Sequence, residues 1–179
     1  IAELRQTGMS LTSSLATASI SITPPPTHTP TETKAQQPMS FSEAMNKWDM
    51  STVLQSGKMA TRRAYGIALR ALGHTNPNVW AVDADVSNST FSNMFGNDSE
   101  LASRFVECKI AEQNMYSVGV GLSAAGKIPF CSTFSKFITR GYDQIEMAIN
   151  SGANIKVVGS HSGISLAADG PSQMSLPDI

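Results

Sequence analysis

Apolar and polar residues follow two regular patterns in the second part of the chain. Short apolar runs of the kind found in buried strands occur at residues 79–85, 104–108, 128–134 and 154–160. Apolar residues with helical spacing occur at 60–73 and 135–152. Because each apolar run is followed by a polar loop or a helix, the sequence predicts an α/β fold built on a parallel sheet.

The first helical stretch carries signals for both of its ends. Thr61 is the predicted N-cap, and Gly73 is the predicted stop. Arg62 falls in the first turn, where the helix dipole disfavours a cation and favours an anion. Arg62 therefore has two possible interpretations: it binds a phosphate, or it is an ordinary solvated arginine. His74, beside Thr-Asn-Pro, is expected at the surface.

Residues 1–57 have a different composition from the rest of the chain. Ser, Thr, Pro and Ala dominate, and a Thr/Pro-rich run occupies residues 23–30. Such a stretch favours extended, polyproline-like conformations and cannot build a core. We therefore expect a flexible interdomain linker over 1–57, with a short helical segment at 41–54 whose Trp48 docks on the domain. The domain is predicted at 58–179 and is expected to be an incomplete piece of a longer protein.

Composition and charge narrow the classes of partner. Hydrophobic residues make up 41% of the chain, which allows a packed core, and the formal net charge of -1 gives no pull toward nucleic acid or membrane. No apolar run approaches the roughly 18 residues of a membrane span. Cys108 and Cys131 lie inside predicted strands and have no metal-ligand spacing, so we expect buried thiols in a reducing, cytoplasmic compartment.

Candidate chemistry gathers where the predicted strands end. Asp85, Glu112, the aromatic pair Phe134 and Phe137, and His161 all follow such strands closely. Ligand sites of parallel α/β sheets lie beyond the carboxyl ends of the strands. Glu112 alone has a simpler explanation, because an acidic residue at a helix start complements the dipole. The glycines after it do not form a dinucleotide fingerprint.

Several motifs at matching spacings resemble the pyrimidine-binding domain of the transketolase family, the animal type most closely. Two of them are Ile-Ala-Glu-Gln-Asn-Met at 110–115 and Asp-Gly-Pro-Ser-Gln-Met at 169–174. The others lie at 60–62, 88–92, 129–134, 139–140, 142–145 and 159–161. The resemblance runs from about residue 58 to the last residue. It implies a thiamine-diphosphate-dependent homodimer whose cofactor lies between two subunits.

The resemblance assigns cofactor contacts to this chain. Glu112 matches the catalytic glutamate that hydrogen-bonds N1′ of the aminopyrimidine and so favours the tautomer whose 4′-nitrogen acts as a base. Phe134 and Phe137 match the aromatic wall around that ring. Ile110 and Asp85 are expected near the cofactor, Asp85 also at the dimer contact. Mg²⁺ or Ca²⁺ would be held by a separate diphosphate-binding domain, so no metal ligand is expected here.

The resemblance also assigns substrate contacts. His161, a second catalytic candidate, and Asp169 match positions that bind hydroxyls of the donor sugar. Arg62 and Ser89 match residues that grip a sugar phosphate. Gln173 stands where some members carry His. The implied reaction is transfer of a two-carbon ketol unit from a ketose phosphate to an aldose phosphate, in the pentose phosphate pathway, with the fragment inactive alone.

One departure keeps alternatives open. The family usually has Gly-Glu before Asp-Gly-Pro, and this chain has Ala167 and Ala168. The change removes an acid and some backbone freedom from the loop. A non-catalytic, transketolase-like binding or dimerisation module is therefore an alternative. Another enzyme that uses the same domain, such as a deoxyxylulose phosphate synthase, fits the motifs less well.

Overall fold

A computed structural model describes residues 40–48, 50–55 and 58–175. Most of the predicted linker, residues 1–39 with the Thr/Pro-rich run, lies outside the described residues, as do residues 176–179. All described residues belong to one compact unit, Gln36–Ile179. The packed part of the chain therefore includes residues N-terminal to position 58.

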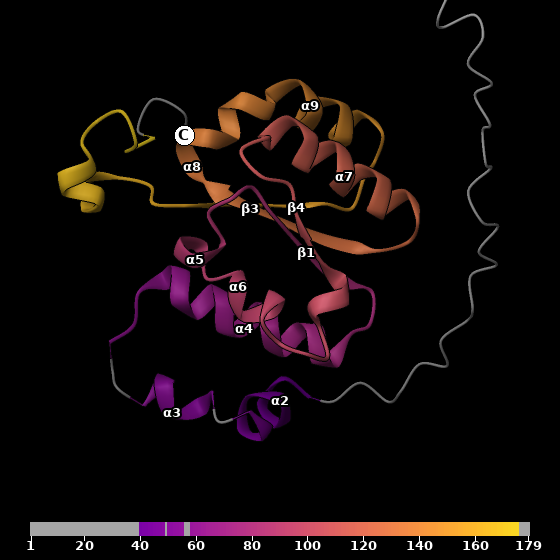
Figure 1. Cartoon of the computed structure of the whole chain (residues 1–179), viewed down its shortest axis with the longest axis vertical. Helices are drawn as coiled ribbons and strands as arrows, with labels where there is room; N and C mark the ends of the chain where they lie inside the picture. The colour runs from indigo at the N-terminus through magenta and orange to yellow at the C-terminus, as the bar shows by residue number, and fades with distance from the viewer. Residues whose placement is uncertain (1–39, 49, 56–57, 176–179) are drawn as a thin grey trace, which may run out of the picture. The chain divides into compact units, whose positions relative to one another are not determined.

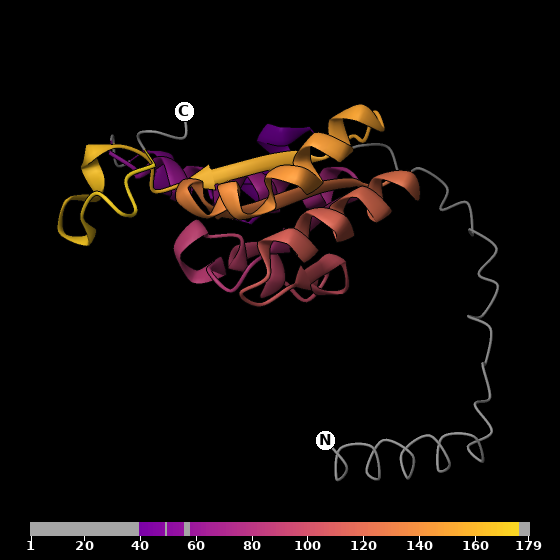
Figure 2. The same cartoon turned by 90° about the horizontal axis from the view of Figure 1, so that it is seen from above.

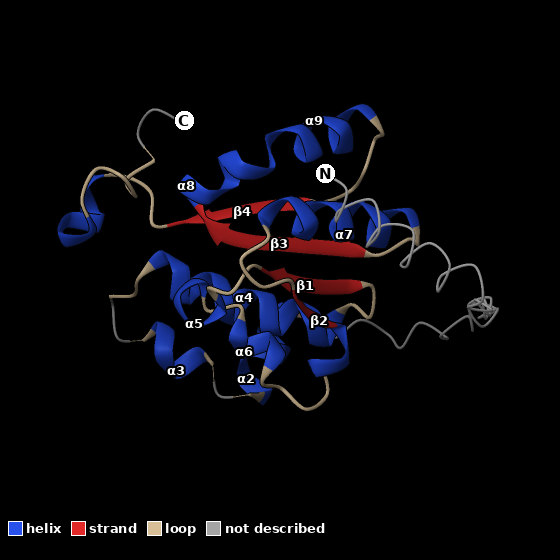
Figure 3. Cartoon of the chain, turned by 45° about the horizontal axis from the view of Figure 1, so that its top comes forward, coloured by secondary structure: helices blue, strands red, loops and turns tan. Residues whose placement is uncertain are grey.

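A parallel four-stranded sheet with the order β2-β1-β3-β4 forms the centre of this unit (Figure 3). The strands are β1 (Val79–Asp83), β2 (Phe105–Glu107), β3 (Ile128–Phe134) and β4 (Lys156–Ser160). The predicted α/β class with a parallel sheet is thus confirmed. Both β1 and β2 end earlier than their apolar runs suggested, and each is followed two residues later by a residue with a positive φ: Asp85 at 64° and Lys109 at 59°.

Helices cover both faces of the sheet. In Figure 1, α7 and α9 lie on one side of the strands, and α4 and α6 lie on the other. The α-helices are α2 (Phe41–Lys47), α3 (Ser51–Leu54), α4 (Thr61–Thr75), α5 (Ser87–Thr90), α6 (Asn93–Gly96), α7 (Glu112–Ala124), α8 (Ser135–Ile138) and α9 (Tyr142–Asn150). Short 3-10 turns follow as η1 (Ala102–Arg104), η2 (Thr139–Gly141) and η3 (Ile164–Asp169).

Strand alternation divides the core into two layers. Val79 and Ala81 of β1 pack with Leu69 of α4 on one face of the sheet. Val82 of the same strand packs with Met115 of α7 on the other face. Successive side chains of a strand point to opposite faces, so one buried strand serves both layers. The sheet is therefore fixed from both sides, and its carboxyl edge is held in place.

Two predicted helix ends were wrong. Ala60 is the N-cap of α4 and Thr61 is its first residue, while Gly73 lies inside the helix. The helix continues to Thr75 because Asn76 precedes a proline, a position that disfavours helical dihedrals. Gly73 serves close packing instead, since a Cβ there would lie 2.4 Å from the Phe95 ring.

The helix predicted over 135–152 is broken into α8, η2 and α9. The break comes at Gly141, which is buried against the ring of Tyr116. A Cβ at this glycine would lie 2.4 Å from that ring, so only glycine fits. The break turns Arg140 toward α7, which matters for the site below.

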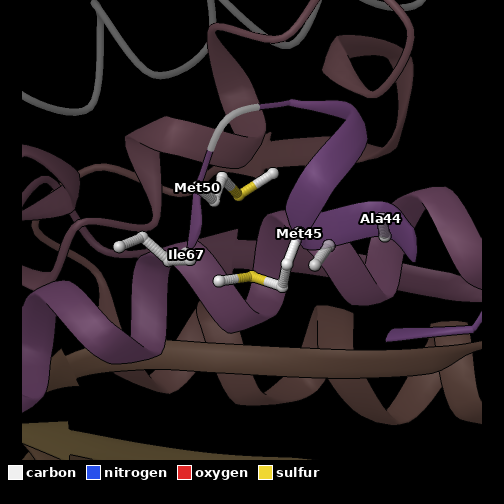
Figure 4. Packing of buried hydrophobic residues seen from close by; sticks show 5 residues of the cluster. Ala44, Met45, Met50 and Ile67 are labelled. Carbon is white, nitrogen blue, oxygen red and sulfur yellow. The ribbon is translucent and has the colours of Figure 1, made fainter. Parts of the chain in front are cut away.

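The segment at 41–54 forms α2 and α3, and α2 packs on α4 of the domain, as predicted for Trp48. Ser40 and Glu43 make a reciprocal capping box at the start of α2. Met45 and Met50 lie with Ile67 of α4 in one buried cluster (Figure 4). The Trp48 ring stacks on His74 at a centroid distance of 3.5 Å.

The surface position expected for His74 was wrong. Its side chain is 4% exposed, and its Nε2 lies 2.8 Å from Oδ2 of Asp98. Burial alone would raise the pKa of Asp98, but the hydrogen bonds from His74 and Arg70 together lower it. Trp48, twenty-six positions upstream (74 − 48), covers the imidazole, and no local pattern around His74 indicates this.

Cys108 and Cys131 are free thiols, half-buried and buried respectively. Burial raises the pKa of Cys131 to about 12, and it also raises the pKa of Cys108. Both groups therefore stay protonated and unreactive at neutral pH. Across the described ranges, no helix has the length and apolar character that a membrane crossing requires.

Candidate functional site

Glu112 is the first residue of α7, directly beyond the loop that leaves β2. Its side chain is 4% exposed, and its Oε1 accepts a hydrogen bond of 2.8 Å from Nη1 of Arg140. The helix start favours a negative charge there, and the arginine compensates it further. The structure therefore keeps a carboxylate nearly out of water at the edge where a ligand site was predicted.

An aromatic pair continues from this carboxylate along the edge of the sheet. Phe134 ends β3 and Phe137 lies in α8, with ring centroids 5.4 Å apart and planes inclined by 15°. The His161 ring lies 4.1 Å from the Phe134 ring, and Cζ of Arg140 lies 4.2 Å from the centre of the Phe137 ring. We call His161, Phe134, Phe137 and Arg140 the four-residue stack.

His161 directly follows β4 in a left-handed conformation with a φ of 58°. Its Nε2 lies 3.2 Å from Nη1 of Arg62, and its Nδ1 lies 2.8 Å from Oγ of Ser160. A guanidinium has no acceptor, so Nε2 must accept and Nδ1 carries the proton that Ser160 receives. These two contacts select one neutral tautomer of the imidazole.

Electrostatics support the neutral form of His161. Burial lowers the pKa of His161, the positive charge of Arg62 lowers it further, and Asp169 acts in the opposite direction. The same Arg62 nitrogen donates to the carbonyl oxygen of Ser89 at 3.1 Å. Arg62 thus joins the start of α4, the loop after β1 and the end of β4.

A cavity of about 760 Å³ opens beside these residues. Its lining comes from the start of α4, the end of β4 and the loop beyond it: Ala60, Thr61, Arg62, Tyr65, Val158, Gly159, Ser160, His161, Ser162, Leu166 and Asp169. Tyr65 Oη lies 2.6 Å from Oγ of Ser132, and burial raises the pKa of Tyr65, so its hydroxyl stays neutral. The wall offers one cation, one carboxylate and several hydroxyls, which suits a polar, hydroxylated anion.

The loop beyond β4 brings Leu166 and Asp169 to this cavity; Figure 2 shows it, in yellow, past the tip of β4. Gly163 N–H donates to the carbonyl of Met174 at 2.8 Å and closes the loop. Gly163 and Gly170 have φ values of 86° and 78°. Ala167 also has a positive φ, 47°, which costs a residue with a Cβ on the order of 1 kcal/mol. The departure from the family pattern therefore falls on a strained position.

A second acid at the end of β1 is buried. Asp83 accepts from the Val86 N–H and from the hydroxyls of Thr90 and Ser92 at 2.8–2.9 Å. Burial outweighs these bonds and raises the pKa of Asp83 to about 6. Asp83 thereby fixes the turn that carries Ser89.

Three predicted site residues lie apart from these contacts. Asp85 is exposed, and its Oδ1 is 3.8 Å from Nζ of Lys109. Ile110 is 74% exposed, ahead of α7. Gln173 donates its backbone N–H to Gly170 at 3.2 Å and does not line the cavity. Their assignment to a site stays a prediction.

Four residues with a place in the site had no role in the sequence prediction. Arg140 and Tyr65 contact Glu112 and Ser132, which are distant in the sequence. Ser160 bonds the neighbouring His161, and Leu166 lines the cavity. Arg140 lies within a matched motif, which is the one signal for it. No group of three or more His, Cys, Asp or Glu residues that could hold a metal ion occurs in the described ranges.

Comparison with known families gives one match over most of the chain. The family model described as "Transketolase, pyrimidine binding domain" matches residues 57–179. The mouse protein "Transketolase" is 53% identical over 123 residues, which is 68% of this chain and 19% of that protein. Mouse "Transketolase-like protein 2" is 49% identical over 141 residues, 78% of this chain and 22% of that protein. The chain spans about a fifth of the length of these curated relatives.

Solved structures agree with this match. Transketolase from Leishmania mexicana aligns with a TM-score of 0.57 and 26% identity, over 64% of this chain and 18% of that chain. A structure described as "Split gene transketolase, inactive beta4 tetramer" aligns with a TM-score of 0.52 and 43% identity, over 59% of this chain and 35% of that chain. Both transketolase structures therefore share the fold of this chain over the aligned part.

Proposed function

The chain belongs to the transketolase family, of which it contains the pyrimidine-binding domain, and from this premise we propose that it binds the aminopyrimidine ring of thiamine diphosphate at the edge formed by Glu112 and Phe137. We further propose that the longer protein transfers a two-carbon ketol unit from a ketose phosphate to an aldose phosphate in the pentose phosphate pathway.

One observation carries the proposal. Glu112 is a nearly buried carboxylate that pairs with a half-exposed arginine, and this arginine lies over the face of an aromatic ring. A buried carboxylate is costly unless it serves a ligand or a permanent partner. A ring that offers a hydrogen-bond donor on its edge and an aromatic face satisfies both groups. The aminopyrimidine has this chemistry in its N1′-protonated or imino form.

The chain's own residues have separate roles. Glu112 holds the proton shared with N1′, and Phe137 supports the ring by stacking. Bound thiamine diphosphate supplies the nucleophilic carbon that the amino-acid side chains lack. Phe134 contacts the ring of His161, which lines the cavity.

The cavity suits the sugar phosphate. Arg62 offers the positive charge for a phosphate, next to Ser89. Neutral His161 presents Nε2 as an acceptor for a substrate hydroxyl once Arg62 turns to the phosphate. Asp169 is the second acceptor for hydroxyls. This division explains why a cation and a carboxylate share one wall.

The proposal includes parts outside this chain. A second subunit and a diphosphate-binding domain with Mg²⁺ or Ca²⁺ would complete the cofactor site. Ile110, Asp85 and Gln173 are proposed to act at that boundary or along the sugar, since they lie apart from the contacts above. Cytoplasmic location remains part of the proposal and rests on the two free thiols.

Ketol transfer from xylulose 5-phosphate to ribose 5-phosphate tests the proposal. The assay compares the full-length parent, its Glu112→Gln variant and this chain, with thiamine diphosphate and magnesium present. Loss of the proton-sharing carboxylate should lower turnover by at least about a hundredfold. Glu146→Gln, on the exposed side of α9, is the matched control. Unchanged turnover in Glu112→Gln would refute the assignment.

A second candidate function rests on the loop beyond β4. Ala167 and Ala168 replace the usual Gly-Glu, and Ala167 carries a positive φ. A non-catalytic, transketolase-like module would bind thiamine diphosphate without transferring a ketol unit. Calorimetric binding measured beside turnover separates the two candidates, and Ala167→Gly with Ala168→Glu is the variant that should restore turnover.

A further inference from the structure

Each ring of the aromatic pair has a further partner in this structure. Phe134 and Phe137 stack on one another, the His161 ring contacts Phe134, and the Arg140 guanidinium lies over Phe137. A flat ring that stacks on Phe137 beside Glu112 competes with Arg140 for that place. The group beside Glu112 is Arg140, which donates to the carboxylate while it lies over the ring.

Arg140 makes two contacts with one planar group. Its guanidinium lies 4.2 Å from the Phe137 ring centre by Cζ, and its Nη1 donates 2.8 Å to Glu112. A flat cation over an aromatic face with its edge toward a carboxylate has the shape and the donor pattern of a protonated aminopyrimidine. The arginine therefore satisfies Glu112 in the same way as the ring proposed to bind there.

The two partners differ in mobility. The Glu112 side chain is 4% exposed, whereas the Arg140 side chain is 50% exposed and lies in the short η2 turn. A half-exposed arginine can swing into water with its charge solvated, and a buried carboxylate cannot leave. If the ring replaces the arginine, Glu112 has a hydrogen-bond donor both before and after binding.

We propose that Arg140 is a specificity-determining latch: it holds the places on Glu112 and Phe137 that the aminopyrimidine takes, and the ring binds by displacing it. The inference rests on the function proposed above and adds a competitor to it. Because the latch leaves only if its bond to Glu112 is replaced, a flat ring without an edge donor is rejected. Selection thus depends on the donor as well as on the aromatic face.

Binding of the aminopyrimidine half of thiamine, in its hydroxymethyl form, to the full 179-residue chain tests the latch. Ligand-observed NMR gives the dissociation constant for the chain and for Arg140→Met, Arg140→Lys and Glu112→Gln. Arg63→Met, at an exposed arginine of α4 outside the site, is the control. Removal of the competitor should tighten binding roughly tenfold in Arg140→Met. Arg140→Lys keeps the charge without the flat face and should fall between.

Side-chain NMR of the unmodified chain gives a readout that needs no variant. With labelled arginine, rotation of the Arg140 guanidinium should be hindered in the free chain and released on saturation with the ring. Toluene or pyridine at equal concentration should leave it hindered, and the Arg63 signal should not change.

The outcomes separate the two proposals. Tighter binding by Arg140→Met together with weaker binding by Glu112→Gln supports the latch. Equal or weaker binding by Arg140→Met, with Glu112→Gln still impaired, overturns the latch and leaves the pyrimidine site in place. Equal binding by Glu112→Gln and the unmodified chain overturns the proposed function and the latch with it. No binding by any variant overturns the latch as a property of this chain, and the ketol-transfer assay on the full-length parent then decides the proposed function separately.

Discussion

His161 shows how single contacts set the chemistry of one side chain. Burial lowers its pKa, Arg62 lowers it further and Asp169 raises it. Arg62→Met should therefore raise the imidazole pKa, and Asp169→Asn should lower it again. NMR titration of the ring protons measures both shifts, with Arg63→Met as the control. Shifts of the same sign in the two variants would contradict the arrangement.

The lowered pKa of His161 also has a consequence for stability. The unfolded chain, with the ordinary pKa near 6.5, binds more protons than the folded chain in this range. The contribution of His161 is therefore fully present above about pH 6.5 and is lost as the pH falls through the folded value. Arg62→Met should weaken this dependence, and urea unfolding at several pH values measures it.

At this scale the sequence located the carboxylate, the aromatic pair and His161, because each follows a strand end. Arg140 was not assigned a role, since its position depends on the break between α8 and α9, where Gly141 packs against the Tyr116 ring. His74 was misplaced because Trp48, its cover, comes from a different helix. Residues fixed by their own strand can be predicted, and residues fixed by a distant ring cannot.

Two helical glycines give opposite predictions for the same substitution. A Cβ at Gly73 of α4 would lie 2.4 Å from Phe95, whereas a Cβ at Gly121 of α7 would meet nothing within 4 Å. Gly73→Ala should destabilise the fold by about 1–3 kcal/mol through overpacking. Gly121→Ala should stabilise it by about 0.5–1 kcal/mol through helix propensity. Thermal unfolding compares the two, and equal effects would mean that α4 does not pack as described.

The turn at α5 depends on the ionisation of Asp83. Its pKa in the folded chain is about 6, above the ordinary value of 3.8, so the folded state holds the proton more tightly. The stability it contributes is present below about pH 4 and is lost as the pH rises through about 6. This difference of about two pKa units corresponds to at most about 3 kcal/mol in the free energy of unfolding.

Asp83→Asn removes this titration while its amide oxygen still accepts from the Val86 N–H. As the pH rises from about 4 to about 6, the free energy of unfolding of the wild type should fall relative to that of the variant. The difference in unfolding free energy across the pH range measures this. A constant difference would show that Asp83 does not titrate there.

Strand positions and the start of α7 were predicted well at the scale of elements, because apolar runs report burial directly. Helix ends were predicted less well. Gly73 looked like a stop and is a packing residue, and the real end is set by Asn76 before a proline. A glycine signal alone does not distinguish a helix end from a close approach.

Docking of α2 on α4 joins the N-terminal segment to the domain. Trp48 stacks on His74, and Lys47 Nζ lies 4.6 Å from the centre of the Trp48 ring. Trp48→Ala should lower the free energy of unfolding by roughly 2–3 kcal/mol, less than for a fully buried tryptophan. Chemical denaturation measures the loss.

Phe41→Ala is the matched control for Trp48→Ala. Phe41 lies on the same helix and is 49% exposed, so its removal should change stability by less than about 0.5 kcal/mol. Similar losses in the two variants would indicate that α2 packs through a different face. A loss confined to Trp48→Ala would show that the contact of residues 41–48 with the domain contributes to the free energy of unfolding.

For the whole molecule, the sequence predicted the α/β class and the sheet edge that carries the site. It predicted that Trp48 docks on the domain but not that Met45 and Met50 are buried there, because these two residues carry no strong local pattern. Their burial depends on the apolar stripe of α4, which is distant in the sequence.

The parallel register also has a kinetic meaning. Val79 pairs with Ile128, and Phe130 pairs with Lys156, so each ladder joins segments that lie far apart in the sequence. Pairings between distant segments slow folding, because loop closure precedes the gain from the contact. His161 follows β4, so its position depends on the pairing of β4 with β3. A probe at His161 should therefore report the closure of the ladder between β3 and β4.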